Sequence, residues 1–185
     1  NFHCKKQEKS SKIEIESDKG YIHKKPEKKI KEKKYMEYEE GKIGRAFVLR
    51  LENGDVLPDC IEKFAKDKGI KCAHVTLIGG IGKGNVVVGP KHPQNIPPEP
   101  VYQSIDGAHE VVASGVIALT DENKPVLHIH GALGRLGNTI TGCLREGVEV
   151  WLVCEAIIYE LLDVDVKRIK DPKSGLKLLS TGVLE

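Results

Sequence analysis

The residues whose types and spacing could do chemistry are two histidines, His128 and His130, in the segment LHIHG at residues 127–131. On a β-strand, residues i and i+2 point to the same face. The two imidazoles would then project side by side, as two ligands of one metal ion require. They are the only such pair among the seven histidines of the chain. The alternative is a pair of strand histidines that form hydrogen bonds and hold no metal.

A third ligand is needed, because a catalytic zinc site has three protein ligands and one open position. The candidate is Cys143, in the segment TGCL, which follows a glycine-rich turn that would bring the chain back towards the histidines. Cys143 could equally be a buried apolar thiol, and His109 is a weaker candidate. A cupin barrel also uses His-x-His on a strand, but it then requires a glutamate where this chain has Gly134.

Two charged residues are candidate ligand contacts. Arg135 stands in the glycine-rich segment GALGRLG, where an arginine could clamp a carboxylate or a phosphate beside a metal ion. It could equally be a solvated turn residue. Glu110 is a candidate acid or base, or an inward charge at the start of a strand. The run GGIGKG at 79–84 lacks the Ser/Thr and the following helix of a phosphate-binding loop. We interpret it as tight turns and as a place where the backbones of packed strands or subunits approach closely.

Apolar and β-branched runs predict the strands that would position these side chains. The expected strands cover 44–51, 72–78, 85–88, 110–119, 126–133 and 147–162. A final hairpin or edge pair is expected around Pro172. Residues 58–68 predict a helix that ends at Gly69, and the five prolines within 89–100 predict a loop. Short connections favour antiparallel pairing. The expected fold class is α+β, a single domain with a mostly antiparallel sheet of about seven strands and one or two helices.

Charge is distributed unevenly along the chain. The 185 residues contain 29 Lys or Arg and 27 Asp or Glu, a net charge of +2. Residues 1–42 hold 13 lysines against nine acids and few apolar residues, which predicts a basic, mobile N-terminal extension. Residues 43–185 carry a net charge of −2 and form the predicted domain. The only methionine, Met36, would be a natural-looking start, so residues 1–35 could come from a misassigned start or could be a true extension. This balance provides no overall signature of nucleic-acid binding.

Cysteine usage and hydropathy bear on location. The five cysteines are odd in number and widely spaced, with no Cys-x-x-Cys, which argues against a disulfide framework and favours the reducing cytoplasm. The sequence contains no run of about 18 apolar residues, so no membrane-spanning helix is expected.

Six segments, in order along the chain, carry a family resemblance: GRAFVLRLENGD, IEKFAKDKGI, HVTLIGGIG, HEVVASGVIAL, LHIHGALG and VEVWLVCEAIIYELL. From about Gly44 to Val166, the chain resembles the PPC domain (plants and prokaryotes conserved) in its stand-alone prokaryotic form, a predicted DNA-binding protein with a PD1-like motif. The resemblance implies an α+β fold, a homotrimer and a metal site that includes the two histidines. Family members often have histidine where this chain has Cys143, and Glu110 matches a commonly acidic position.

Two functional hypotheses follow, with a structural alternative. The first is a cytoplasmic homotrimeric PPC-domain protein with a DNA-binding or regulatory role. It would hold a divalent metal ion, expected to be zinc, through His128, His130 and Cys143. The second is a metal-dependent enzyme acting on a small anionic substrate, in which the metal activates water or polarises a carbonyl, Glu110 moves protons and Arg135 holds the anion. The structural alternative is a trimer whose histidines pack against neighbouring residues and hold no metal. The expected partners are further copies of the chain and DNA, with no membrane.

Overall fold

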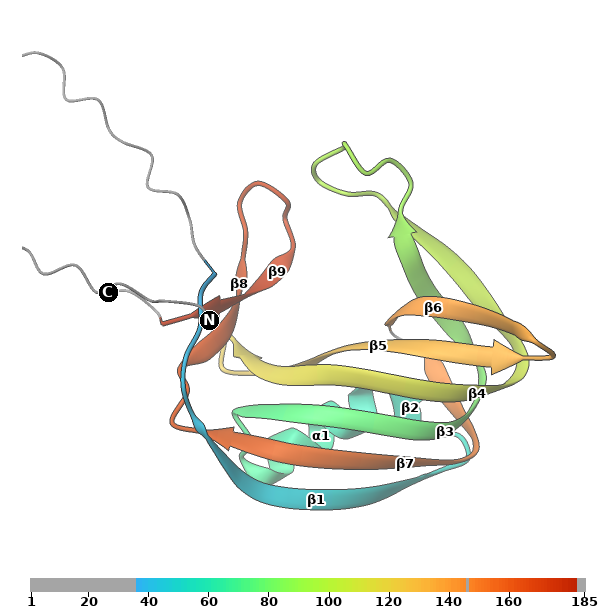
Figure 1. Ribbon diagram of the computed structural model, residues 1–185, viewed down its shortest axis with the longest axis horizontal. Helices are drawn as coiled ribbons and strands as arrows, with labels where there is room; N and C mark the ends of the chain where they lie inside the picture. Colours follow the sequence, from blue (N-terminus) through green and yellow to red (C-terminus); the bar gives the residue numbers. More distant parts are fainter. Residues whose placement is uncertain (1–35, 146, 183–185) are drawn as a thin grey trace, which may run out of the picture. The chain divides into compact units, whose positions relative to one another are not determined.

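The computed structural model describes residues 36–145 and 147–182, which contain one helix and nine paired strands. Along the chain the elements are β1 (Lys42–Glu52), β2 (Val56–Leu57), α1 (Asp59–Lys68), β3 (Cys72–Pro90), β4 (Pro100–Thr120), β5 (Pro125–Arg135), β6 (Asn138–Leu144), β7 (Val148–Leu162), β8 (Val166–Lys170) and β9 (Lys177–Thr181). The sheet order is β1-β7-β3-β6-β5-β4-β8-β9, with β2 paired to β7 (Figure 1). The predicted α+β class with a mostly antiparallel sheet is confirmed.

The predicted number of about seven strands is wrong, since nine strands pair within the described residues. At two residues, β2 is too short to give a pattern in the sequence. β6 follows β5 after a very short turn, so the apolar pattern does not separate it. Conversely, the two strands expected at 72–78 and 85–88 are one continuous strand, β3. The final hairpin is confirmed as β8 and β9.

The glycine run at 79–84 lies inside β3 and not in a turn. Gly79 and Gly84 have φ angles of 137° and 133°, a conformation that glycine adopts readily and other residues rarely do. A Cβ atom at Gly79 would run into the carbonyl of Val153 on β7. The expected close backbone approach is confirmed and the expected tight turns are wrong, because β3 shifts its register with β4 and β7 here without reversing direction.

The middle of the sheet closes on itself. β3 and β4 form a long antiparallel hairpin, β4 pairs with β5, and β5 pairs with β6. β6 then returns to the far part of β3, where Leu144 pairs with Val86 and Cys143 pairs with Val87. Four strands therefore form a closed circuit. β8 pairs in parallel with the end of β4, so the β8–β9 hairpin rises on the same side of the sheet as the loop between β3 and β4 in Figure 1.

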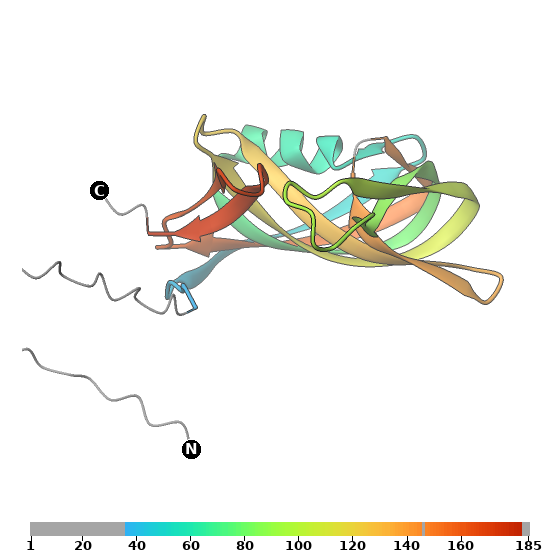
Figure 2. The same ribbon diagram turned by 90° about the horizontal axis from the view of Figure 1, so that it is seen from above.

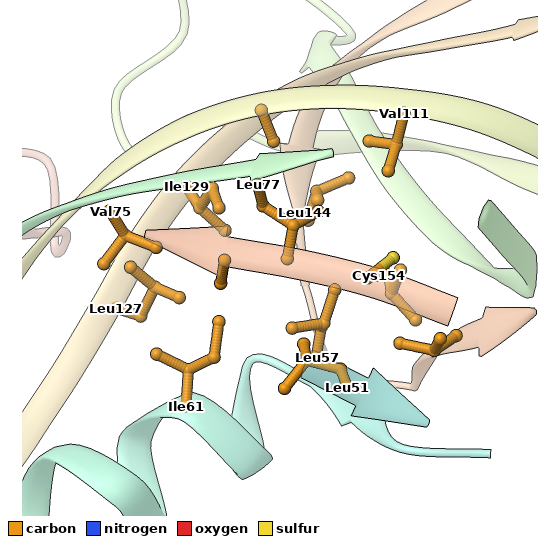
Figure 3. Packing of buried hydrophobic residues seen from close by; sticks show 14 of the residues in the cluster. Leu51, Leu57, Ile61, Val75, Leu77, Val111, Leu127, Ile129, Leu144 and Cys154 are labelled. Carbon is orange, nitrogen blue, oxygen red and sulfur yellow. The ribbon is translucent and has the colours of Figure 1, made fainter. Parts of the chain in front are cut away.

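Helix α1 covers one face of the sheet (Figure 2). The predicted helix is confirmed, and it ends at Gly69, whose φ of 67° is the usual left-handed C-terminal conformation. Ile61 and Ala65 form its inner face and are fully buried. Figure 3 shows Ile61 pointing from the helix towards strand side chains such as Leu127. The buried core therefore lies between α1 and the strands, which leaves the opposite face of the sheet open.

The predicted N-terminal extension at 1–42 lies mostly in a part of the chain that the structure does not describe. Its boundary and the start at Met36 therefore stay predictions. Within the described part, no helix is long and apolar enough to cross a membrane. The described cysteines are free thiols: Cys60, Cys72, Cys143 and Cys154.

One ion pair fastens β1 to β7. Glu160 is only 6% exposed, and its two carboxylate oxygens accept hydrogen bonds of 2.7 Å from Nε and Nη2 of Arg45. These hydrogen bonds hold the pKa of Glu160 below its ordinary value of 4.5. The folded protein therefore favours the charged form of this carboxyl, and that preference contributes to stability near neutral pH.

We expect Glu160→Gln to lower the free energy of unfolding near neutral pH, and the loss to shrink on acidification. The ionised carboxylate stabilises the fold fully above its ordinary pKa of 4.5, which applies in the unfolded chain. Its contribution disappears as the pH falls through the lower pKa of the folded state. Urea unfolding of both proteins between about pH 7 and about pH 3 measures the difference. Glu122→Gln is the control, because Glu122 and its partner Lys124 are both exposed and exposed ion pairs contribute little to stability. A loss that grows on acidification would contradict this account.

Candidate metal centre

His128 and His130 lie side by side on the exposed face of β5. Their Nε2 atoms are 3.1 Å apart, and their ring centroids are 4.9 Å apart with the planes at 73°. Ile129 lies between them in sequence, points to the other face and is fully buried. The alternation expected from the i, i+2 spacing is confirmed. The buried isoleucine holds the strand that carries both rings.

Cys143 reaches the histidines because β5 and β6 form a tight hairpin. At its turn, Leu136 and Gly137 have φ angles of 50° and 80°, and the register that follows places Cys143 opposite His130. One ligand atom from each of His128, His130 and Cys143 lies within 4.8 Å of the others. The structure thus brings together the three residues proposed from the sequence. No second group of this kind occurs in the part of the chain that the structure describes.

The two histidine nitrogens are spaced as the ligands of a metal ion such as zinc would be. Two nitrogen ligands of a tetrahedral zinc ion, each at about 2.0–2.1 Å, are about 3.3 Å apart, close to the 3.1 Å between the two Nε2 atoms. Two imidazoles and one thiolate are ligands that zinc accepts. Three protein ligands leave a fourth position for a further group.

The charge states of the candidate ligands suit metal binding. Desolvation of its ring lowers the pKa of His128 to about 4, and electrostatic interactions with Arg168, His130 and Arg145 act in the same direction. The ring is therefore neutral near pH 7 and has a lone pair available. Burial raises the pKa of the Cys143 thiol, and the two arginines oppose this effect. Near neutral pH the thiolate therefore forms when a metal ion displaces the proton.

Two cavities meet at the histidine pair, which lines both. The larger, of about 780 Å³, extends from β6 to the loop between β3 and β4 and the tip of the β8–β9 hairpin. Its other walls include Val87, Pro98, Pro100, Tyr102, Arg145 and Leu176. The smaller has a volume of about 420 Å³. It is also lined by Ser114, Val116, Arg168, Lys177, Leu178 and Leu179.

The two charged residues predicted as ligand contacts lie away from this cluster. Arg135 is the last residue of β5, and at about 3.3 Å per residue it is far along the strand from His130. Its Nη1 donates to the carbonyl of Ala108 at 3.0 Å. Glu110 pairs in register with Gly134, near that same end of β5. Neither residue lines either cavity at the histidines.

His109, the weaker ligand candidate, is also separate from the cluster. It is buried, and its Nδ1 makes a hydrogen bond of 2.8 Å with the carbonyl of Gly107. Its position on β4 is opposite Ile81 of β3. The structure therefore gives His109 a place in the bend of the long hairpin and not in the candidate centre.

Two arginines that the sequence analysis did not select do lie near the histidines. Arg145 follows Cys143 by two positions and lines the larger cavity, so the alternation rule that paired the histidines could have found it. Arg168 lies on β8 and lines the smaller cavity. Its place depends on the parallel pairing with Thr120 of β4. No local pattern indicates such a contact between distant segments.

A polar pair on the neighbouring strands was also missed. Ser114 of β4 pairs in register with His130, and its Oγ makes a hydrogen bond of 2.9 Å with Nε2 of His74 on β3. The open face of the sheet therefore carries a polar row that leads from β3 to the histidine pair. Its residues are far apart in the sequence, so only strand pairing reveals it.

A comparison with known families matches residues 38–162 to the Plants and Prokaryotes Conserved (PCC) domain, which is also abbreviated PPC. The match spans more than half of the chain. The chain belongs to this family. The resemblance expected from the six sequence segments is thereby confirmed. The matched PCC domain includes both β5 and β6 and therefore the whole candidate centre.

Solved structures resemble this PCC domain closely. A metal-containing protein from Archaeoglobus fulgidus is 29% identical, with a TM-score of 0.69 over 78% of this chain and 99% of that chain. A plant- and prokaryote-conserved protein from Pyrococcus horikoshii is 28% identical, with a TM-score of 0.68 over 80% and 100%. A Bacteroides thetaiotaomicron protein described provisionally as DNA-binding shares the fold at 18% identity, with a TM-score of 0.63 over 76% and 97%. None of the curated proteins matches the chain.

The approach of β6 to β3 in this PCC domain depends on Gly142. A Cβ atom there would run into the carbonyl of Val87 and lie 2.8 Å from Cγ1 of Val86. We expect Gly142→Ala to push β6 away from β3, expose the buried Cys143 thiol and raise its alkylation rate several-fold. Iodoacetamide labelling followed by peptide mass spectrometry measures the rate at Cys143.

Gly134→Ala is the matched control for this experiment. Gly134 lies on the partner strand β5, and a Cβ atom there would meet nothing closer than 3.9 Å. Its alkylation rate at Cys143 should equal that of the unmutated protein. Equal rates in all three proteins would show that the contact at Gly142 does not control the position of Cys143.

Proposed function

We propose that this PCC-domain protein holds a zinc ion through His128, His130 and Cys143 and presents it to the larger cavity. The observation that carries the proposal is the convergence of the three ligand atoms within 4.8 Å. The neutral state of His128 near pH 7 also supports it. The similar Archaeoglobus fulgidus protein is described as metal-containing, which agrees with a metal centre in this fold.

The proposed centre suits a protein that binds or converts a small molecule. When bound with an open position, zinc can polarise a carbonyl or lower the pKa of a water molecule. Arg145 and Arg168 contribute positive charge around the histidines and favour an anionic ligand. These charges support the alternative of a metal-dependent enzyme acting on a small anionic substrate. Arg145 and Arg168, and not Arg135, would then hold the anion.

We expect the unmutated protein to bind about one zinc ion per chain. Loss of a residue that only orients a metal ligand typically weakens metal binding by about 10–100-fold. The single variants His128→Ala, His130→Ala and Cys143→Ala should each weaken zinc binding by more than that. Elemental analysis and competition with a chromogenic chelator measure stoichiometry and affinity. His92→Ala, in the exposed loop between β3 and β4, is the control and should bind zinc normally. An unmutated protein without near-stoichiometric metal would refute the proposal.

The homotrimer implied by the family resemblance is part of the same proposal. An apolar patch on the sheet face opposite α1 supports it, because such patches mark interfaces. Its exposed members include Val48 at 81%, Ile78 at 52% and Val112 at 68%. Register places Val48 beside Ile157 and Ile78 beside Val112, so the exposed apolar side chains form one pair across β1 and β7 and another across β3 and β4. The cytoplasmic location stays a prediction from the cysteine pattern.

We expect a mass in solution of three chains of 20.4 kDa each. Val112→Glu should place a charge within the buried interface and shift the mass towards that of a single chain. Light scattering after size-exclusion chromatography measures the mass. Ile96→Glu is the control, because Ile96 is exposed in the loop between β3 and β4 and lies outside the patch. A monomeric unmutated protein would show that the patch has another role.

A DNA-binding role is the second candidate function. It is supported by the Bacteroides thetaiotaomicron structure of the same fold, which is described provisionally as DNA-binding. The lysine-rich residues 1–42 would supply contacts to phosphate, whereas residues 43–185 carry a net charge of −2. DNA binding by this chain would therefore depend largely on the extension.

We expect the affinity of the full chain for duplex DNA to fall as salt rises, since bound phosphates release counterions. Fluorescence anisotropy with a labelled duplex across a salt series measures the slope. A chain that starts at Met36 is the matched comparison and should bind more weakly with a shallower slope. A flat or undetectable response of the full chain would rule out binding through the phosphate backbone.

A further inference from the structure

The cavities on either side of the histidine pair are positively charged. Arg145 lines the larger cavity, and Arg168 and Lys177 line the smaller one. Neither lining contains an Asp or a Glu. In the described part of the chain, no ion pair within 4.0 Å is found for these three cations. Cations without a carboxylate on both sides of the histidine pair favour an anionic ligand there.

Arg168 gives the strongest indication, because it is a buried charge with incomplete hydrogen bonding. It is 6% exposed, and its Nη2 donates to the carbonyl of Val116 at 3.2 Å. Its Nε atom is buried and donates to no acceptor among the described residues. Buried charges are normally paired, because an unpaired one is costly. A guanidinium group in this state is suited to a carboxylate, whose planar geometry matches its donors.

The walls of the larger cavity are largely apolar. Pro98 lies at the end of the loop between β3 and β4. Pro100, Tyr102 and Val87 lie on the adjoining strands, and Leu176 comes from the β8–β9 hairpin. A cavity of about 780 Å³ falls in the size range typical of small-molecule sites. The apolar walls favour a ligand with a hydrocarbon or aromatic body, while the positive charge lies at the histidine end.

We propose that this cavity binds a small organic monocarboxylate with an apolar body. The carboxylate lies at the histidine end beside Arg145, and the body lies against Tyr102 and the prolines. Arg168, which lines the adjoining cavity on the other side of the histidine pair, adds positive charge there. The inference rests on the proposed function, because the same histidines are the proposed zinc ligands. It adds the chemical class of the ligand and assigns its recognition to two arginines and an aromatic wall.

Isothermal titration calorimetry with benzoate as the probe tests this proposal on the full chain, in metal-free and zinc-loaded form. Benzamide is the neutral comparison, and acetate has the carboxylate without the body. We expect benzoate to bind at least about tenfold more tightly than either. Arg145→Met should weaken benzoate binding by about tenfold. Tyr102→Ala should weaken the binding of benzoate more than that of acetate.

The matched control is Arg50→Met, which removes an exposed arginine on β1 that pairs with Glu52. It should bind benzoate as the unmutated protein does. Arg168→Met should weaken benzoate binding, and Arg168→Lys should weaken it less because the positive charge remains. Thermal unfolding shows whether each variant is folded. If the variants of the buried Arg168 do not fold, the benzoate affinity of the Arg145→Met variant alone tests the proposal.

Two results would overturn the proposal: equal affinities for benzoate and benzamide, or an equal loss in Arg50→Met and Arg145→Met. Zinc stoichiometry measured on the same samples separates the two proposals. A protein that takes up zinc but shows no preference for benzoate retains the metal centre and loses the carboxylate site. A protein that prefers benzoate but takes up no zinc retains the carboxylate site and loses the metal centre.

Discussion

The backbone pairing of β6 with β3 is the interaction on which the candidate centre depends. Through it, β3, β4, β5 and β6 form a closed circuit, with Cys143 opposite both His130 and Val87. Backbone hydrogen bonds set this register, and a shift of one residue would turn Cys143 to the other face. The closure requires glycine at position 142, because any Cβ atom there would strike β3. A residue without chemistry of its own therefore decides whether three ligands meet.

The core and the centre use opposite sides of the same strands. Ile129 is fully buried on the inner face, between two histidines that lie on the outer face. Burial of alternate residues thus stabilises the strand and orients both imidazoles. Helix α1 covers the inner face alone (Figure 2), so the outer face is available for a ligand or another subunit. The alternation of side chains along the strand thus gives one face to the stabilising core and the other face to the candidate metal ligands.

The two hairpins beside the centre give it a chemical character that the three ligands alone would not have. The β3–β4 hairpin adds prolines and Tyr102, and the β8–β9 hairpin adds Leu176 and Lys177. With Arg145 they produce a largely apolar cavity that is positive at its histidine end, next to a smaller cavity that Arg168 and Lys177 line. Similar PCC-family structures share the sheet, so variation in such loops offers a way to change the ligand while the framework is kept.

Local sequence patterns by themselves determined the parts of this protein that depend on near neighbours. The period of two in LHIHG placed His128 and His130 on one face, and Pro58 and Gly69 bounded the helix closely. The family was also recognisable from the order of its segments. The glycine run at 79–84 was misjudged as a turn, since whether glycine bends a strand or reverses it depends on the strands packed beside it.

Only the tertiary structure decided which charges surround the histidines. Arg135 is close to them in sequence, yet an extended strand carries it away, where it bonds to Ala108. Arg168 is distant in sequence and comes close through the parallel pairing of β8 with β4. Local periodicity reports which face a side chain is on. It contains no information on which strand lies alongside, because that depends on hydrogen bonds and packing between segments that are many residues apart.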